Sequence, residues 1–467
     1  MRVSRTAVRV AGVTLAVCVA GVVVPSYAAS SSHISLRSPI RITSPGQTAL
    51  TCPVEGEPAV TVTSAGTWVG YNDDQGCPLL PTVTLHLSGL QLIPAGGGAP
   101  RYVRIDAPAG EYLSGDPALA PDPQHPGSVL LATLQSRPSG LGLAVYSVSP
   151  SLRVTTLPNP SVDPKHTSDD KELIASDTNP KSRFRGRTYL AWDDFTGAKI
   201  LTFRAFNGRR WEAPVRLAEI QGAPDVAVAP NGDVAVTFET ATGVGLRISY
   251  DGGKSFTDTL EVLRGGPPGR LDPACPLRPS VGQRQRVIKS PRVTYDSAGI
   301  AHVVAALGGG GSVFSVGTAN AGLLTGGYGT IRIARTRDGI NLLSESTVAM
   351  PQGGDVQFNP AIARTPKGGI AVEWLQTTGN PQTSFNSWLA VAQPGSATFA
   401  GPVKLSDDAV QFPPAFEIYG NSDCYGIGDY TGLASTREGV VAVWPTSGLQ
   451  VTKYFDTDVL AREAVVR

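Results

Sequence analysis

The stretch APDVAVAPNGDVAVTFE, residues 223–239, has the pattern of a complete β-hairpin. Val226 and Val228 alternate with small or polar residues, as on one face of a half-buried strand. Asn231 and Gly232 then favour a tight turn, after which the apolar alternation resumes. The stretch therefore predicts two short antiparallel strands.

This pattern recurs along the chain. In residues 57–73, 290–307 and 359–376, as in 223–239, a Pro near the start is followed eight residues later by a Gly at the turn. Looser copies occupy residues 115–134, 171–194 and 428–444, which gives seven units about 50 to 70 residues apart. Units at such a period indicate a stacked or circular repeat architecture.

Each unit has a second half, in which a polar loop leads to another strand and another turn. Residues 247–263 and 331–348 show this clearly. Four short strands per unit are typical of a β-propeller blade. We therefore predict an all-β propeller of four-stranded antiparallel blades, six or seven in number. Helical periodicity is nearly absent, and only Leu460–Val466 is a candidate for a turn or two of helix.

The N-terminus indicates export. Residues 1–28 carry arginines, then an apolar run, then Ser26-Tyr27-Ala28, which predicts a secretory signal peptide. A lipoprotein signal at Cys18 is the disfavoured alternative, because the apolar run continues past it. No later stretch has the roughly 18 apolar residues of a membrane span. We predict an extension over 29–54, the propeller over 55–467, and a secreted, extracellular monomer.

Net charge and cysteine content bear on the class of partner and on disulfide formation. The formal charge of +1 includes three signal-peptide arginines, so the mature chain carries −2, which argues against nucleic acid as a partner. An even number of cysteines in an exported chain predicts two disulfides, and we favour the local pair first. The favoured pairing is Cys52–Cys77 and Cys275–Cys424.

The segment SYDGGKSF, residues 249–256, matches the Asp-box pattern Ser-x-Asp-x-Gly-x-Ser/Thr-aromatic. Asp251 can accept backbone N–H groups of its turn, and glycines such as Gly253 allow positive φ. A lone acid is a poor calcium loop, so a structural turn is favoured over a functional one. The pattern residues are Ser249, Asp251, Gly253, Ser255 and Phe256.

With this segment, GDPALA (115–120), DKELIASD (170–177) and GDYTGLAS (428–435), the chain resembles the sialidase-like (Asp-box, or BNR-repeat) propeller superfamily, and in particular secreted bacterial exo-α-sialidase-like proteins. The resemblance implies three arginines that hold a carboxylate, a Tyr nucleophile with a Glu partner, and an Asp acid/base. The first arginine normally lies in an aromatic-Arg-Ile/Leu-Pro motif. Arg41-Ile42-Thr43 and Arg104-Ile105-Asp106 are the nearest matches, and both lack the Pro.

In a propeller, loops that enter each first strand and leave each second strand surround one mouth of the channel, and the Asp-box turns lie on the opposite face. The loops of that channel face are rich in acids, which could bind a cation, sugar hydroxyls or a basic peptide; many of them could equally be turn-formers. The candidate ligand site is Asp73, Asp74, Asp116, Asp169, Asp170, Lys171, Asp193, Asp194, Arg292, Asp429 and Tyr430.

Glu239 and Glu373 fall on return strands that should be buried, and a buried Glu needs a partner, for which we expect Arg292. The sequence predicts an exported scaffold that binds a glycan or a protein at the channel face, rather than an enzyme. The alternative is a retaining glycoside hydrolase of sialidase type. No cofactor is required for either, although calcium is compatible with the acids.

Overall fold

The computed structural model describes residues 34–42, 55–73, 88–161, 167–197, 200–219, 222–268, 270–271, 279–281, 285–308, 329–351, 355–378, 383–412, 427–447 and 457–466. Residues 31–467 form one compact unit, and the signal-peptide prediction lies outside the described residues. All four predicted disulfide cysteines and Asp74 also lie outside them.

The described elements are all strands, and they pair antiparallel except where residues 140–141 pair in parallel with residues 167–168. In chain order the strands are β1 (Ile34–Leu36), β2 (Ile40–Ile42), β3 (Glu55–Thr63), β4 (Gly66–Asp73), β5 (Ser88–Pro94), β6 (Arg101–Val103), β7 (Tyr112–Leu113), β8 (Ala118–Pro121), β9 (Val129–Arg137), β10 (Gly140–Val148), β11 (Val154–Thr156), β12 (Thr167–Ser176), β13 (Thr188–Asp194), β14 (Ile200–Phe206), β15 (Val215–Glu219), β16 (Asp225–Val228), β17 (Val234–Glu239), β18 (Gly243–Ser249), β19 (Leu260–Arg264), β20 (Arg270–Leu271), β21 (Pro279–Val281), β22 (Gln285–Arg286), β23 (Arg292–Tyr295), β24 (Ala301–Gly308), β25 (Gly329–Thr336), β26 (Leu342–Ala349), β27 (Gln357–Arg364), β28 (Ile370–Thr378), β29 (Ser384–Ala392), β30 (Val403–Lys404), β31 (Val410–Gln411), β32 (Gly432–Ser435), β33 (Gly439–Ser447) and β34 (Thr457–Val466).

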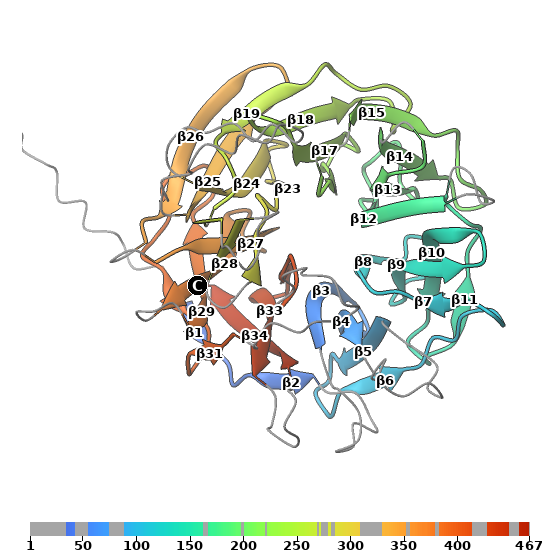
Figure 1. Cartoon of the computed structure of the whole chain (residues 1–467), viewed down its shortest axis with the longest axis horizontal. Helices are drawn as coiled ribbons and strands as arrows, with labels where there is room; N and C mark the ends of the chain where they lie inside the picture. Colours follow the sequence, from blue (N-terminus) through green and yellow to red (C-terminus); the bar gives the residue numbers. More distant parts are fainter. Residues whose placement is uncertain are drawn as a thin grey trace, which may run out of the picture. The chain divides into compact units, whose positions relative to one another are not determined.

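The sheets follow one another around a ring, which confirms the predicted all-β propeller (Figure 1). Within the described residues, the innermost strands contact each other in sequence order, and the last of them contacts the first. Each predicted repeat unit supplies one of these strands. The innermost strands are β3, β8, β12, β16, β23, β27 and β32.

The ring is closed by strands from both ends of the described chain. β34 pairs with β33 on one side and with β1 and β2 on the other. The helical turn expected at Leu460–Val466 was wrong, because this segment is the third strand of the closing sheet. Its side chains alternate between buried and partly exposed, as a strand within a sheet requires.

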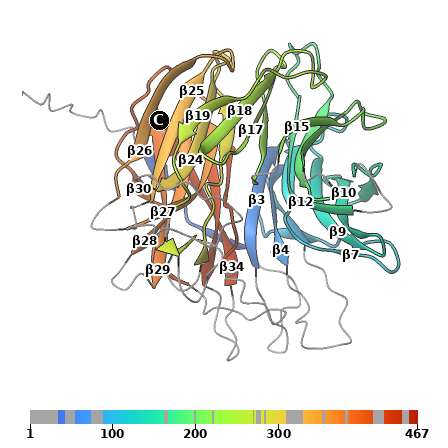
Figure 2. The same cartoon turned by 45° about the horizontal axis from the view of Figure 1, so that its top comes forward.

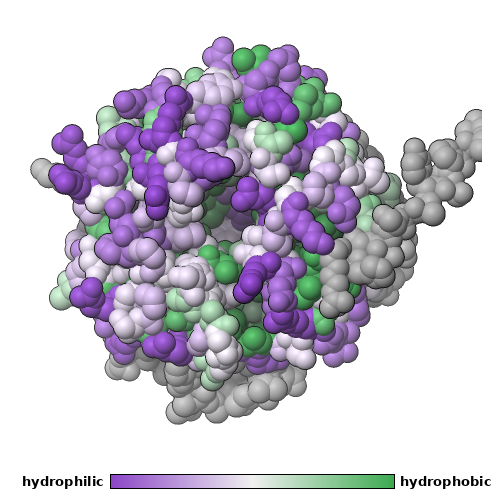
Figure 3. Space-filling model, turned by 180° about the vertical axis from the view of Figure 1, so that it is seen from behind, coloured by the Kyte–Doolittle hydropathy of each residue, from purple (hydrophilic) through white to green (hydrophobic). Residues whose placement is uncertain are grey.

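The strands run roughly along the axis of the ring, so each innermost strand has one end at each mouth of the channel (Figure 2). Seen from behind, the ring is hollowed at its centre, and hydrophilic residues lie around the hollow (Figure 3). None of the described residues belongs to a helix long and apolar enough to cross a membrane.

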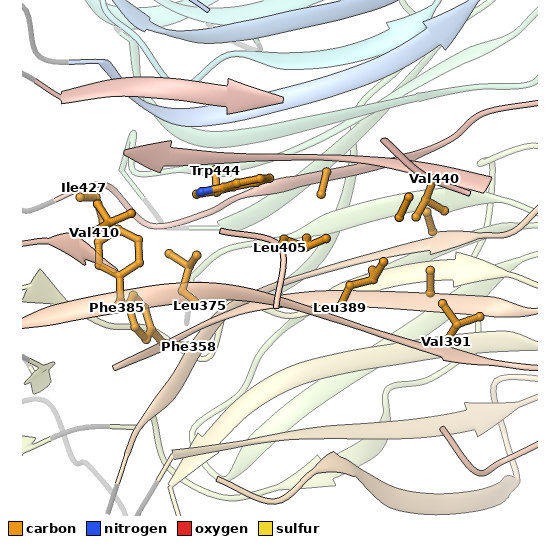
Figure 4. Packing of buried hydrophobic residues seen from close by; sticks show 14 of the residues in the cluster. Phe358, Leu375, Phe385, Leu389, Val391, Leu405, Val410, Ile427, Val440 and Trp444 are labelled. Carbon is orange, nitrogen blue, oxygen red and sulfur yellow. The ribbon is translucent and has the colours of Figure 1, made fainter. Parts of the chain in front are cut away.

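The core consists of apolar clusters between neighbouring sheets. The cluster in Figure 4 brings Phe358, Phe385 and Leu389 of one sheet against Trp444 and Val440 of the next. Tryptophans on second strands are fully buried, at 68, 192, 374 and 444. Fully burying such large side chains removes apolar area from water, which is the main favourable term in packing the sheets together.

Candidate channel-face site

The residues that enter the innermost strands share an unusual backbone. Glu57, Asp116, Lys171, Ala223, Ser290 and Asn359 have φ between 45° and 58°. A non-glycine residue in this left-handed region costs about 1–3 kcal/mol and persists only where its surroundings hold it. In five of the six a Pro follows, whereas Glu172 follows Lys171. The third repeat unit therefore departs from the common pattern at the channel mouth.

Hydrogen bonds between neighbouring sheets hold several of these residues. Asn72 Oδ1 accepts from the backbone N–H of Asp116 (2.8 Å), and Asp193 Oδ2 accepts from that of Ala223 (3.2 Å). Glu239 Oε1 accepts from the backbone N–H groups of both Lys289 (2.8 Å) and Ser290 (3.3 Å). Polar side chains at the ends of second strands thus hold the residues that lead into the innermost strand of the next sheet.

Lys171 is the centre of the candidate site. Its Nζ lies 2.7 Å from Asp429 Oδ2, 3.2 Å from Asp116 Oδ2 and 3.9 Å from Glu57 Oε1. The three carboxylates come from three other repeat units, so one ammonium group joins four repeat units. We call Lys171, Glu57, Asp116 and Asp429 the Lys171 cluster. Burial would lower the pKa of Lys171, but the carboxylates of Asp116 and Asp429 raise it well above its usual value.

For Glu57, the effect of burial on the pKa outweighs the effect of the neighbouring Lys171 charge. Burial, reinforced by the charge of Asp116 and opposed by Lys171, raises the pKa of Glu57 to about 8. Its Oε1 also accepts from the backbone N–H of Asp429 at 2.8 Å. At neutral pH Glu57 is therefore largely protonated, and Lys171 faces fewer than three full negative charges.

Tyr430 lies beside this cluster, between two cations. The Lys171 Nζ is 5.7 Å from the centroid of its ring, and the Arg292 Cζ is 5.2 Å from it. Both distances are within the range of cation–π attraction. Burial, followed by the charges of Asp116 and Glu57, raises the pKa of Tyr430 well above its usual value. Its phenol therefore stays protonated at neutral pH.

Glu172, the residue after Lys171, is a buried acid that the sequence analysis did not predict as part of the site. It is 1% exposed, and neither carboxyl oxygen has a hydrogen-bond partner among the described residues. Burial and the charge of Asp116 raise its pKa well above the usual value. The signal that could have identified Glu172 is its place in the repeat, where other units have Pro.

The structure brings together only some of the predicted residues: Asp116, Lys171, Asp429, Tyr430 and Arg292 meet at the channel mouth. Asp169, Asp170, Asp193 and Asp194 instead face one another across β12 and β13. Their carboxylates accept hydrogen bonds from Trp192 Nε1 (2.9 Å), Lys171 N (2.9 Å), Ala223 N (3.2 Å) and Thr196 N (2.8 Å), respectively.

Three further acids, Asp73, Glu239 and Glu373, have hydrogen-bond partners that the sequence did not predict. Asp73 is buried at the end of β4 and accepts from Tyr102 Oη at 3.3 Å. The expected pairing of Arg292 with Glu239 and Glu373 was wrong. Glu373 accepts from the hydroxyls of Ser387 (2.8 Å) and Thr431, while Glu239 binds backbone N–H groups. Hydroxyls thus satisfy Glu373, whereas Glu239 also lies 3.9 Å from the Nζ of the buried Lys289.

Residues 249–256 form a self-contained turn. Asp251 Oδ1 accepts from the backbone N–H groups of Lys254 (3.0 Å) and Ser255 (2.9 Å) and from the Ser249 hydroxyl (2.9 Å). Burial would raise the pKa of Asp251, but these hydrogen bonds lower it to about 2. The Phe256 ring packs edge-on against Phe203, with 4.9 Å between centroids. The turn thus anchors its sheet to the preceding one.

The arginine set of sialidases is not assembled around Tyr430 in the described residues. There the ring contacts involve one arginine, Arg292, together with Lys171. No group of His, Cys, Asp and Glu among the described residues is arranged to hold a metal ion.

No protein-family model and no curated protein matches the sequence. Solved structures that resemble it include an ulvan lyase of polysaccharide lyase family PL25 (12% identity, 88% of this chain and 94% of that chain, TM-score 0.48). Others are the α-L-arabinanase of Penicillium chrysogenum (12%, 91% and 98%, 0.47) and a leech intramolecular trans-sialidase (11%, 71% and 67%, 0.41). At these identities and TM-scores, no substrate or mechanism carries over to this chain.

Proposed function

We propose that this protein is an exported propeller that binds a glycan at its channel face and does not catalyse sialidase-type hydrolysis. The observation that carries this proposal is the Lys171 cluster beside Tyr430 and Arg292. It offers charged donors, carboxylate acceptors and an aromatic ring at one channel mouth. Sugar hydroxyls both donate and accept hydrogen bonds, so a mixed set of this kind suits them.

The protonation states favour binding over catalysis. A Tyr nucleophile needs a nearby carboxylate that can take its proton. Of the acids closest to this role, Glu57 has its pKa raised to about 8 and is largely neutral at pH 7, and burial raises the pKa of Glu172 well above its usual value. Tyr430 itself holds its proton more tightly than a free phenol. The second candidate, a retaining glycoside hydrolase, is favoured by the same juxtaposition of a Tyr with two glutamates.

Binding and turnover can be separated in one set of measurements. Purified mature protein is assayed on a panel of immobilised glycans and on fluorogenic glycosides that include a sialoside. We expect glycan binding without turnover. Lys171→Met should weaken that binding at least tenfold, because it removes the cation that orders Asp116 and Asp429. Lys181→Met alters an exposed lysine and serves as the matched control.

Since Lys171→Met could also unfold the protein, Arg292→Gln provides a second variant, and thermal melting is recorded for both. Turnover of a glycoside that is lost in Tyr430→Phe or Glu172→Gln would establish the hydrolase instead. Binding to proteins but to no glycan would contradict the ligand class.

A further inference from the structure

The channel has a cavity at the mouth opposite the Lys171 cluster. Its volume is about 600 Å³, which lies within the range of about 300–1,000 Å³ usual for small-molecule sites. It is lined by the far ends of the innermost strands β3, β12, β16, β23, β27 and β32. Figure 3 shows the ring from this side, with the hollow at its centre.

Several polar residues that line the cavity have no side-chain partner among the residues that the structure describes. Arg364, Thr61, Thr178, Thr294 and Ser435 make no side-chain hydrogen bond or ion pair with any other described residue. They come from β3, β23, β27 and β32 and from the segment after β12. Arg364, Thr178 and Ser435 are exposed and Thr294 is half-buried, so their polar groups are open to solvent at this mouth and available to a ligand.

Two charged residues, Arg364 and Asp177, are among the described residues that line the cavity. The carboxylate Asp177 also lines it, but Asp177 accepts from the Ser182 hydroxyl and from the backbone N–H of Asn179 (3.2 Å). Among the described lining residues, Arg364 is thus the charged group that is left for a ligand. A guanidinium presents donors in a fork that matches a carboxylate, so the lining favours a ligand with one carboxylate.

We propose that this cavity binds a sugar acid. The carboxylate pairs with Arg364, and the hydroxyls of Thr61, Thr178, Thr294 and Ser435 exchange hydrogen bonds with those of the sugar. Val60, Ile362 and Leu433 also belong to the lining, and their side chains pack in the apolar clusters between sheets behind it.

This site is distinct from the channel-face site. Arg292 and Thr294 lie two residues apart on β23, about 7 Å along a strand, and each belongs to a different end of the channel. The proposal therefore does not depend on the proposed function. A variant at either end tests that end alone.

The test is calorimetric titration of the full mature protein with D-galacturonate, D-galactose and acetate. Galacturonate should bind with a Kd of about 1 mM or lower, and galactose and acetate at least tenfold more weakly. Arg364→Gln should weaken galacturonate binding at least tenfold, and Thr294→Val several-fold. Arg209→Gln, at another exposed arginine, should leave it unchanged.

Two results would overturn the proposal. One is the absence of galacturonate binding at about 10 mM, or equal binding by Arg364→Gln protein. The other is acetate or galactose binding as tightly as galacturonate. Equal binding of acetate would mean that the cavity recognises only the carboxylate, and equal binding of galactose that it recognises only the hydroxyls. A loss of binding in Arg292→Gln would place the ligand at the channel face instead.

Discussion

Single residues show how burial sets the chemistry of this molecule. Glu57, Glu172 and Glu373 are buried acids whose pKa values are raised chiefly by loss of water. The sequence identified Glu373 as a buried acid from its place on a return strand. It could not identify its partners, Ser387 and Thr431, because Thr431 lies on the neighbouring sheet and is brought close only by the closed ring.

Glu373 makes folding depend on pH. Burial raises its pKa to about 8 from the ordinary 4.5, although hydrogen bonds from Thr431 and Ser387 oppose the rise. Between these values the folded chain keeps a proton that the unfolded chain releases. The free energy of unfolding should therefore fall as pH rises, by about 1 kcal/mol per pH unit from this group, and level off above pH 8.

Glu373→Gln should remove this contribution, so the variant gains stability relative to the wild type as pH rises from 5 to 8. Urea unfolding at several pH values measures the difference. Glu219→Gln, at an exposed glutamate, should run parallel to the wild type. A Glu373→Gln curve that also runs parallel would mean that Glu373 is ionised in the folded protein.

At the scale of elements, the spacing between Pro and Gly predicted the hairpins well, because each hairpin is fixed by its own turn residues. The innermost strands consequently overlap the predicted repeat units, although β3, β12 and β27 begin before the predicted bounds. The candidate site was predicted only in part. Asp116, Lys171 and Asp429 were predicted as site residues. The sequence does not show which residues at the starts of the innermost strands lie close to one another across the channel. Asp193 and Asp194 were predicted for the same reason and instead bind backbone N–H groups, Asp193 that of Ala223 before the next sheet and Asp194 that of the nearby Thr196.

The turn at residues 249–256 gives a test of packing between sheets. Gly253 has φ of 90°, and a Cβ there would lie 2.5 Å from Phe203 Cε1. Gly299 has φ of 74°, but a Cβ there would meet nothing within 4 Å. Gly299→Ala should therefore cost only the left-handed strain, about 1–2 kcal/mol. Gly253→Ala should cost about 1–3 kcal/mol more, because Phe203 must also move.

Urea unfolding of both variants checks this difference. Equal losses in the two would show that the turn does not pack against Phe203 of the preceding sheet.

For the whole molecule, the decisive feature is how the ring closes. β1 and β2 lie near the start of the chain and complete the sheet that holds β34 near its end. Ion pairs add to this pairing: Arg41 Nη1 lies 2.7 Å from the buried Asp458 Oδ2. Without these strands, β34 would be an exposed edge with unpaired backbone groups. Stability of the ring should thus depend on residues that precede the first repeat unit.

β2 offers a matched pair for testing closure. Ile42 is 0% exposed and packs with Val69, Tyr71 and Val443, which belong to two neighbouring sheets. Ile40, on the same strand, is 38% exposed. Ile42→Ala should cost about 2–5 kcal/mol from lost burial and the cavity left behind, and Ile40→Ala less than about 1 kcal/mol. If closure belongs to the cooperative unit, Ile42→Ala lowers the midpoint of a single melting transition observed by both circular dichroism and tryptophan fluorescence. An unchanged global midpoint, with only faster proteolysis near the N-terminus, would mean that β2 frays independently and that the ring is held without it.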